Sequence, residues 1–232
     1  MKLLLCGRGV KLDMAVFSPN LTTKLIIKSA KAAFTESIKS VCELGCGQGD
    51  ITFSLAESFP ISHYFASDIS SEAIEAARNK LALICNRSDI KIGDGLDPWR
   101  GYKFDLIIND VAGISQIIAE KSEWYENIPS ACGPDGLNHS RKILQDVCSF
   151  LNPGGLYLVP LISLSDTDLH LKLLKNCFGN VVVENRTWWP LPKGLCDESL
   201  LKLAATQGGI QYELKFAKYL AFTEIAVCVY NP

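Results

Sequence analysis

Three glycines follow an acidic residue in the segment VCELGCGQGD, residues 41–50, at a spacing that suits ligand binding. Gly45, Gly47 and Gly49 carry no side chain, so the backbone of this loop can approach a bound molecule closely. The apolar residues before the loop predict a buried strand, and the residues after it predict a helix. In a sheet protein, a ligand held by such a loop lies at the carboxyl end of the strand.

The acidic residues around this loop favour one kind of ligand over another. A dinucleotide-binding loop has glycine at its sixth position, where this chain has Asp50, a poor neighbour for a pyrophosphate. Glu43 lies just before the loop and suits a cationic ligand. Asp68 ends the next predicted strand, where it can accept hydrogen bonds from a ribose. Asp94 follows the third strand and can accept from an adenine amino group. Together these acids favour S-adenosylmethionine, which carries an ammonium, a sulfonium and a ribose.

Strand and helix patterns alternate along the rest of the chain, which predicts a Rossmann-like, doubly wound α/β fold. We expect a mostly parallel seven-stranded sheet with an antiparallel edge hairpin at the C-terminus. The predicted strands are 37–44, 63–67, 89–92, 104–108, 156–161, 181–183 and 220–230. The predicted helices are 51–59, 71–83, 137–151 and 166–177, with a turn at 152–155. No helix of the same rhythm is evident between the last two strands. Residues 1–36 are expected to form an N-terminal cap segment, and 37–232 the cofactor-binding domain.

Three segments, VCELGCGQGD, FASDIS and IGDG, resemble the cofactor motifs of class I S-adenosylmethionine-dependent methyltransferases. More narrowly, the chain resembles the release-factor glutamine methyltransferases and the related small-domain ribosomal RNA guanine methyltransferases over roughly residues 14–160. The segments that carry this second resemblance are VFSPNLTTKLI (16–26), FDLIIND (104–110), and GPDGL (133–137) with Arg141 and Ile143. The cofactor contacts that the residues and the resemblance together predict come from Pro19, Thr23, Glu43, Gly45, Cys46, Gly47, Gly49, Asp68, Ile69, Asp94 and Asn109.

The segment that would bind the methyl acceptor departs from the family pattern. Those families carry Asn-Pro-Pro-Tyr or a close variant where this chain has Asn109-Asp110-Val111-Ala112. We predict that Asn109 and Asp110 are the catalytic residues, with Asp110 accepting a hydrogen bond or a proton from the acceptor. The alternative for Asp110 is a loop acid or a helix cap. The acceptor is therefore expected to be an amine, amide or hydroxyl of a small molecule or protein, and to differ from a release-factor glutamine.

Composition limits the partners of this chain. The net charge is -2 and the pI is about 5.9, so no broad electrostatic surface for nucleic acid is expected. The nine cysteines form no CxxC pair and the three histidines share no ligand spacing, so we predict no metal site. No apolar run approaches the length of a membrane span or a secretory signal, and the isolated thiols favour the cytoplasm. The oligomeric state is not predicted.

Two other functions fit parts of the sequence. A binding module that keeps the cofactor fold without catalysis is consistent with the altered segment at Asn109. A nicotinamide-dependent oxidoreductase is disfavoured by Glu43 and Asp50. Trp124 and Tyr125, in the long segment after Asp110, either pack this segment onto the body of the domain or cover the acceptor site.

Overall fold

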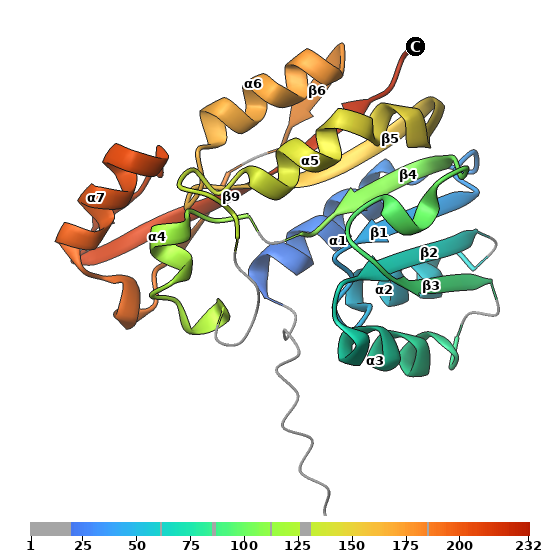
Figure 1. The fold of residues 1–232 in the computed structure, drawn as a ribbon, viewed down its shortest axis with the longest axis horizontal. Helices are drawn as coiled ribbons and strands as arrows, with labels where there is room; N and C mark the ends of the chain where they lie inside the picture. The colour runs from blue at the N-terminus through green and yellow to red at the C-terminus, as the bar shows by residue number, and fades with distance from the viewer. Residues whose placement is uncertain (1–19, 61, 85–86, 112, 126–130, 185) are drawn as a thin grey trace, which may run out of the picture.

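The computed structural model describes residues 20–60, 62–84, 87–111, 113–125, 131–184 and 186–232 (Figure 1). The strands are β1 Ser40–Leu44, β2 His63–Asp68, β3 Ser88–Ile92, β4 Phe104–Asn109, β5 Leu151–Ile162, β6 Asn180–Val183, β7 Thr187–Pro190, β8 Glu213–Lys215 and β9 Lys218–Val229. The α-helices are α1 Leu21–Ala33, α2 Asp50–Ser58, α3 Ser71–Leu81, α4 Gln116–Ala119, α5 Asn138–Asp146, α6 Thr167–Cys177 and α7 Glu198–Gly208. Short 3₁₀ helices are η1 Asp97–Trp99, η2 Glu123–Tyr125, η3 Val147–Phe150 and η4 Lys193–Leu195.

The described strands form one sheet in the order β3-β2-β1-β4-β5-β9-β6, and β7 and β8 each pair with β9. Strands β1 to β5 are parallel to their neighbours in this order, whereas β9 is antiparallel to β5 and to β6. β8 and β9 form the antiparallel hairpin near the C-terminus. The predicted Rossmann-like fold is confirmed, and the short strands β7 and β8 extend the predicted seven-stranded sheet.

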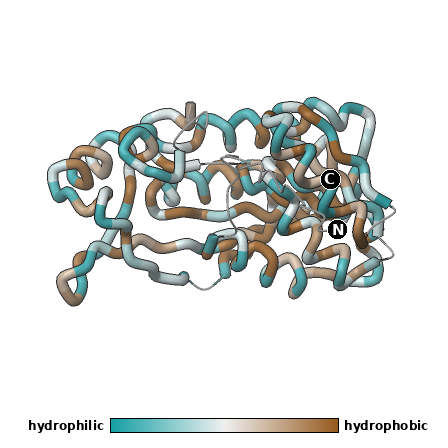
Figure 2. Tube along the Cα trace, turned by 90° about the horizontal axis from the view of Figure 1, so that it is seen from below, coloured by the Kyte–Doolittle hydropathy of each residue, from teal (hydrophilic) through white to brown (hydrophobic). Residues whose placement is uncertain are grey.

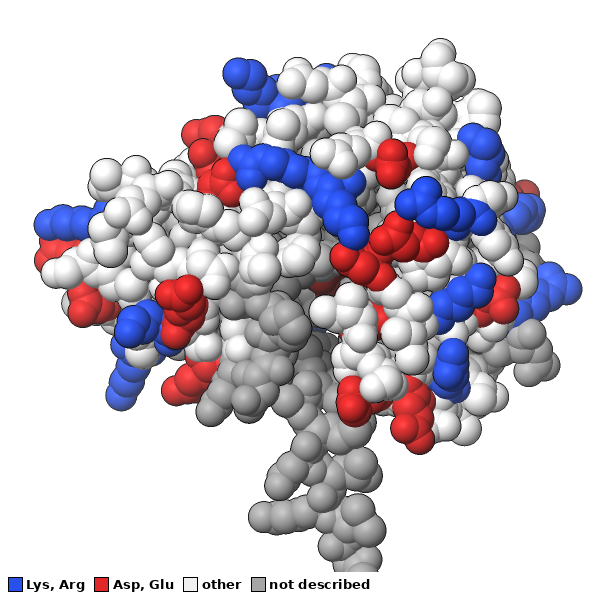
Figure 3. All heavy atoms as spheres, in the orientation of Figure 1, with Lys and Arg blue, Asp and Glu red and all other residues white. Residues whose placement is uncertain are grey.

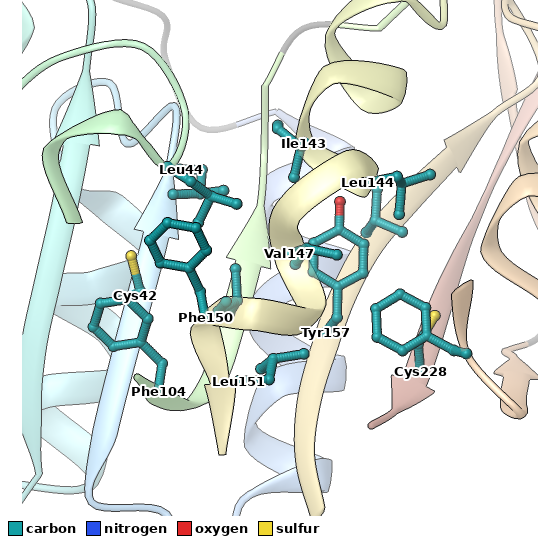
Figure 4. Packing of buried hydrophobic residues seen from close by; sticks show 14 of the residues in the cluster. Cys42, Leu44, Phe104, Ile143, Leu144, Val147, Phe150, Leu151, Tyr157 and Cys228 are labelled. Carbon is teal, nitrogen blue, oxygen red and sulfur yellow. The ribbon is translucent and has the colours of Figure 1, made fainter. Parts of the chain in front are cut away.

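Helices cover both faces of the sheet, and an apolar core lies on each (Figures 1 and 2). On one face, α5, η3 and α6 pack on a cluster that includes Phe104, Val147 and Tyr157 (Figure 4). On the other face, α1 and α2 bury Ile26 and Leu55 against the strands. Because β1, β2 and β4 are buried on both faces, they read as nearly continuous apolar runs in the sequence.

The structure corrects the predicted boundary between α5 and β5. The helix predicted to reach Leu151 ends at Asp146 and is followed by η3. β5 then begins at Leu151 and continues through the predicted turn at residues 152–155, because Leu151 pairs with Phe104 before the register with β4 shifts. Gly154 has φ +78° within this irregular stretch. The NPGG sequence therefore marks a bulge inside a strand and not the turn that we predicted.

A second correction concerns the segment between β6 and β9, where the sequence showed no evident helix. This segment holds β7, η4, the helix α7 and β8. The side chain of Asp197 caps α7 by accepting a hydrogen bond from the Leu200 N–H at 3.0 Å. Leu201 and Ala204 are buried in a cluster shared with α4. Because Thr223 pairs with Ile162 at the end of β5, the first part of β9 continues beyond the carboxyl edge of the parallel strands. α4, α7 and this part of β9 lie together on the left in Figure 1.

Candidate functional site

Backbone hydrogen bonds hold the glycine loop against the end of β2. The N–H groups of Gly45 and Cys46 both donate to the Ser67 carbonyl oxygen, at 2.9 and 3.0 Å. The Gly47 N–H donates to Oδ2 of Asp68 at 2.9 Å. The loop and the carboxylate that ends β2 thus form one connected unit, which joins two segments that the sequence placed apart.

The three glycines of the loop have left-handed backbone conformations, with φ values of +73° for Gly45, +51° for Gly47 and +79° for Gly49. A Cβ on Gly45 would lie 3.1 Å from the backbone of Val111, so this glycine lets the loop pack against the segment after β4. A Cβ on Gly47 would meet no atom within 4 Å. Gly47 therefore borders open space beside the loop.

Glu43 is a buried carboxyl beneath the loop. Its Oε2 accepts hydrogen bonds from the Thr52 N–H, at 2.9 Å, and from the Thr52 hydroxyl, so it anchors the first turn of α2. Burial raises the pKa of Glu43 to about 8; the Thr52 hydrogen bonds oppose this shift and the charge of Asp110 adds to it. The contact with a cationic ligand that we predicted for Glu43 stays a prediction.

Asp68 ends β2 beside the open space at Gly47, and Ile69 directly follows it. Both carboxylate oxygens of Asp68 are oriented by backbone donors, since Oδ1 accepts from the Ser70 N–H at 2.9 Å. Ile69 is 55% exposed. A carboxylate for ribose hydroxyls and an apolar side chain for an adenine face suit S-adenosylmethionine, so the residues present fit this group.

Four other residues that we predicted to bind the cofactor are buried, are paired within the chain, or lie outside the described residues. Cys46 is buried within the loop, and burial raises the pKa of its thiol. Thr23 is buried in α1, and its N–H donates to the capping side chain of Asn20 at 3.0 Å. Asp94 forms an ion pair with Lys142, with Oδ2 2.6 Å from Nζ. Pro19 lies outside the described residues. Their contacts with a cofactor stay predictions.

Asn109 and Asp110 lie side by side at the carboxyl end of β4. Asn109 is buried; its Nδ2 donates to the Tyr157 hydroxyl at 2.7 Å, and its Oδ1 accepts from the Val111 N–H at 3.1 Å. The Asp110 N–H donates to the carbonyl oxygen of Leu44, the residue before the glycine loop, at 3.0 Å. Asn109 therefore fixes the backbone on both sides of Asp110.

The pKa of the Asp110 carboxyl group is shifted by its surroundings. Burial raises its pKa to about 7. The charge of Asp110 contributes to the raised pKa of Glu43. It also contributes to the raised pKa of Tyr125, for which burial and then Cys132 are the larger causes. Tyr125 thus lies near Asp110, whereas its neighbour Trp124 packs edge-on against Trp189 with ring centroids 5.8 Å apart. Both residues pack against the apolar cluster that α4 and α7 share, and a role in covering the acceptor site stays a prediction.

Two residues at this end of the sheet have roles that the sequence did not indicate. Tyr157 points from β5 to Asn109, and nothing distinguished it from an ordinary core tyrosine. His170 is only 3% exposed in α6. Its Nε2 has no hydrogen-bond partner among the described residues. A helical histidine gives no signal of this kind, because the signal depends on which atoms the fold places around it.

A family model described as a methyltransferase domain matches residues 35–217, and the chain belongs to this family. The matched part of the chain is a methyltransferase domain of the class I, S-adenosylmethionine-dependent type. The glycine loop, Asp68 and the acids after β3 and β4 lie at the carboxyl edge of the parallel strands, where open α/β sheets bind ligands.

Similar curated proteins are release factor glutamine methyltransferases. That of Dictyoglomus turgidum is 29% identical over 187 residues, which cover 75% of this chain and 64% of that protein. That of Moorella thermoacetica is 31% identical over 157 residues, covering 63% of this chain and 54% of that protein. The chain thus spans somewhat more than half the length of these relatives.

The fold also matches solved structures. The crystal structure of a precorrin-6y C5,15-methyltransferase from Geobacter metallireducens has a TM-score of 0.57, with 12% identity and 91% of both chains covered. At this identity the match shows the fold alone. Within the described ranges, no group of three or more His, Cys, Asp or Glu residues could hold a metal ion. No helix in the same ranges is long and apolar enough to cross a membrane.

Proposed function

We propose that this enzyme methylates a nitrogen or oxygen atom that loses a proton during transfer, and that Asp110 accepts this proton. The observation that carries the proposal is the Asp110 carboxyl at the end of β4, with its pKa raised to about 7. A group with a pKa near neutral is an effective proton acceptor, because it is partly ionised and still basic. A neutral amine, which gains the methyl group and then releases a proton, or a hydroxyl of a small molecule or protein fits this role.

The residues of the chain divide the remaining work. S-adenosylmethionine, when bound, supplies a methyl group on a sulfonium. The glycine loop and Asp68 would hold it at the ends of β1 and β2. Asn109, fixed by Tyr157 and Val111, sets the direction of the Asp110 backbone. Holding both reactants in line accounts for a large part of the acceleration in such displacements.

The surface agrees with an acceptor other than nucleic acid. On the face shown in Figure 3, Lys and Arg side chains alternate with Asp and Glu. Lys142, for example, pairs with both Asp94 and Asp97, and Arg100 pairs with Asp97. On the described part of this face, cations paired in this way form no continuous track for phosphates.

A second candidate is methylation of a release-factor glutamine, the activity named for the similar curated proteins. The segment at residues 133–137 favours it, because this segment resembles the corresponding one of the release-factor glutamine methyltransferases. Asp135 orders the turn by binding Arg141 and by accepting a hydrogen bond from the Leu137 N–H at 3.0 Å. The departure of Asn109-Asp110-Val111-Ala112 from the Asn-Pro-Pro-Tyr pattern of those families nevertheless disfavours this acceptor. The two candidates differ in the acceptor and not in the cofactor.

The test is incubation of the purified chain with methyl-labelled S-adenosylmethionine and fractionated cell extract, beside a purified release factor. We expect label in a small-molecule or protein fraction, and little label in the release factor. Asp110→Asn should lower this transfer far more than it lowers cofactor affinity. Efficient labelling of the release-factor glutamine by the unmodified chain would overturn the proposal in favour of the second candidate.

A further inference from the structure

A pocket lies between the helix α1 and the strands β6, β7 and β9. Its volume is about 420 Å³, which falls within the usual range of sites for small molecules. Two buried residues of β9 form part of its lining, and the side chains that reach it from the other elements are those of Leu25, Lys28, Val183, Glu184 and Thr187. Four of these five are half-buried and Lys28 is exposed, so each has surface that a bound molecule can touch.

This pocket is separate from the site of methyl transfer. Neither Asp68 nor Asp110 lines it, and no residue of the glycine loop does. In the sheet, β1, β4 and β5 lie between β2, which ends at Asp68, and β9. The pocket can therefore take a molecule of its own while a cofactor occupies the ends of β1 and β2.

Two side chains of opposite charge line the pocket without pairing with each other. Oε2 of Glu184 accepts a hydrogen bond from the Ser29 hydroxyl of α1, which holds this carboxylate at the wall. Within the described ranges, Lys28 forms no ion pair, although it lines the same space. A carboxylate and an ammonium that stay apart in one pocket are complementary to a ligand that carries both charges, each placed against its opposite.

The rest of the lining is mainly apolar. Leu25 and Val183 present half-buried aliphatic side chains, and Leu25 belongs to the apolar cluster that α1 forms with the sheet. An apolar ligand would leave the charged ends of Glu184 and Lys28 without partners, and a ligand made only of polar groups would leave the aliphatic wall uncovered. A small zwitterion with an aliphatic or aromatic side chain satisfies both parts of the lining.

We propose that this pocket binds a free apolar α-amino acid. Its ammonium lies at Glu184, its carboxylate lies at Lys28, and its side chain lies against Leu25 and Val183. The proposal does not depend on the identity of the methyl acceptor, because it involves none of the residues assigned to methyl transfer.

The test is calorimetric titration of the purified chain with L-leucine and L-phenylalanine at up to millimolar concentration. Saturating S-adenosylhomocysteine is present throughout, so that the cofactor site, which also suits an amino-acid group, is already filled. Two analogues each lack one charge: L-leucinamide has no carboxylate, and N-acetyl-L-leucine has no ammonium. We expect one amino-acid site per chain and weaker binding of both analogues.

Three variants locate the site. Glu184→Gln keeps an oxygen for Ser29 and should weaken amino-acid binding about ten- to a hundredfold, the usual range for a lost hydrogen bond between charged groups. Lys28→Gln should weaken it by at most about fivefold, because Lys28 is exposed. Lys24→Gln is the matched control, since Lys24 is an exposed lysine of the same helix that does not line the pocket. Melting temperatures of all three show whether the fold is kept.

Two results on the unmodified chain would overturn the proposal, whatever the variants do. One is the absence of binding heat with both amino acids at millimolar concentration, and the other is N-acetyl-L-leucine binding as tightly as L-leucine. Binding that survives unchanged in Glu184→Gln would also overturn it, because the amino acid would then lie elsewhere. Failure of the proposed function is seen separately, as Asp110→Asn transferring methyl groups at the normal rate.

Discussion

The cofactor side and the acceptor side of this enzyme treat their polar groups differently. On the cofactor side, both oxygens of Asp68 accept from backbone N–H groups, and Glu43 is bonded to Thr52. On the acceptor side lie His170 Nε2 and Ser115 Oγ, the two buried side-chain atoms without a partner within the described ranges. The proposed cofactor side is thus held by hydrogen bonds within the chain, whereas the other side contains two buried polar atoms that lack such a bond within the described ranges.

The strongest test of the organised side is Gly47→Val. We expect cofactor binding to be abolished, because the new side chain would project into the open space beside the loop. Valine would also be strained at the left-handed φ of this position. Gly101→Val is the matched control, since Gly101 likewise has a positive φ and no atom near its Cβ position. Calorimetry with S-adenosylmethionine should show loss only for Gly47→Val. Equal binding by both variants would place the cofactor elsewhere.

A smaller loss is expected for Asp68→Ala. The change removes the proposed ribose contact and also releases the N–H groups of Gly47 and Ser70. Hydrogen bonds to charged groups contribute about 1.5–3 kcal/mol, so cofactor affinity should fall about ten- to a hundredfold. Asp94→Ala should lose less, because its carboxylate is half-exposed and paired with Lys142. The reverse ranking would mean that Asp94 and not Asp68 is the main polar contact.

The buried carboxyls predict how stability depends on pH. In the folded chain the pKa is about 8 for Glu43 and about 7 for Asp110, whereas such groups ionise near 4 when unfolded. The folded chain holds more protons between these values, so the free energy of unfolding should fall as pH rises from about 4 to 8.

Glu43→Gln should flatten this fall by up to about 1.4 kcal/mol per pH unit. Glu57→Gln, at an exposed position of the same helix α2, is the control. Urea unfolding at several pH values between 5 and 8 measures both slopes. A slope that Glu43→Gln leaves unchanged would show that Glu43 is ionised in the folded chain.

The smallest effect is expected at Ser115. Ser115→Ala removes a buried hydroxyl without a partner in the described part of the chain, so the free energy of unfolding should change by less than about 1 kcal/mol. Ser163→Ala is the contrast, because Ser163 Oγ accepts from the buried Phe222 N–H at 2.9 Å. That variant should lose about 1–3 kcal/mol. Equal losses would mean that Ser115 has a partner.

Much of the cofactor side was predictable from sequence because its signals are local. The glycine loop, the acid after β2 and the alternation of strands and helices are each visible within a few residues. The β5 boundary was missed because pairing with Phe104 extends the strand through a turn-like sequence. The helix α7 was missed because its short apolar face gains its burial from α4, far away in the chain.

For the proposed acceptor side, the sequence indicated only Asn109 and Asp110, whose catalytic roles stay predictions. The proximity of Tyr125 to Asp110 and the bond between Tyr157 and Asn109 both join segments that are distant in sequence. No periodicity or spacing records which atoms meet there. A residue type alone also does not reveal a raised pKa, which depends on burial in the folded chain.

The division between the two sides is tested most directly by measuring turnover and cofactor affinity together on Asp68→Ala and Asp110→Asn. The measurement is transfer of labelled methyl to the acceptor fraction at saturating S-adenosylmethionine, beside calorimetric titration of the same samples. The account predicts that Asp68→Ala loses affinity but keeps most of its turnover once saturated, and that Asp110→Asn keeps affinity but loses turnover. Parallel losses of affinity and turnover in both variants would contradict it.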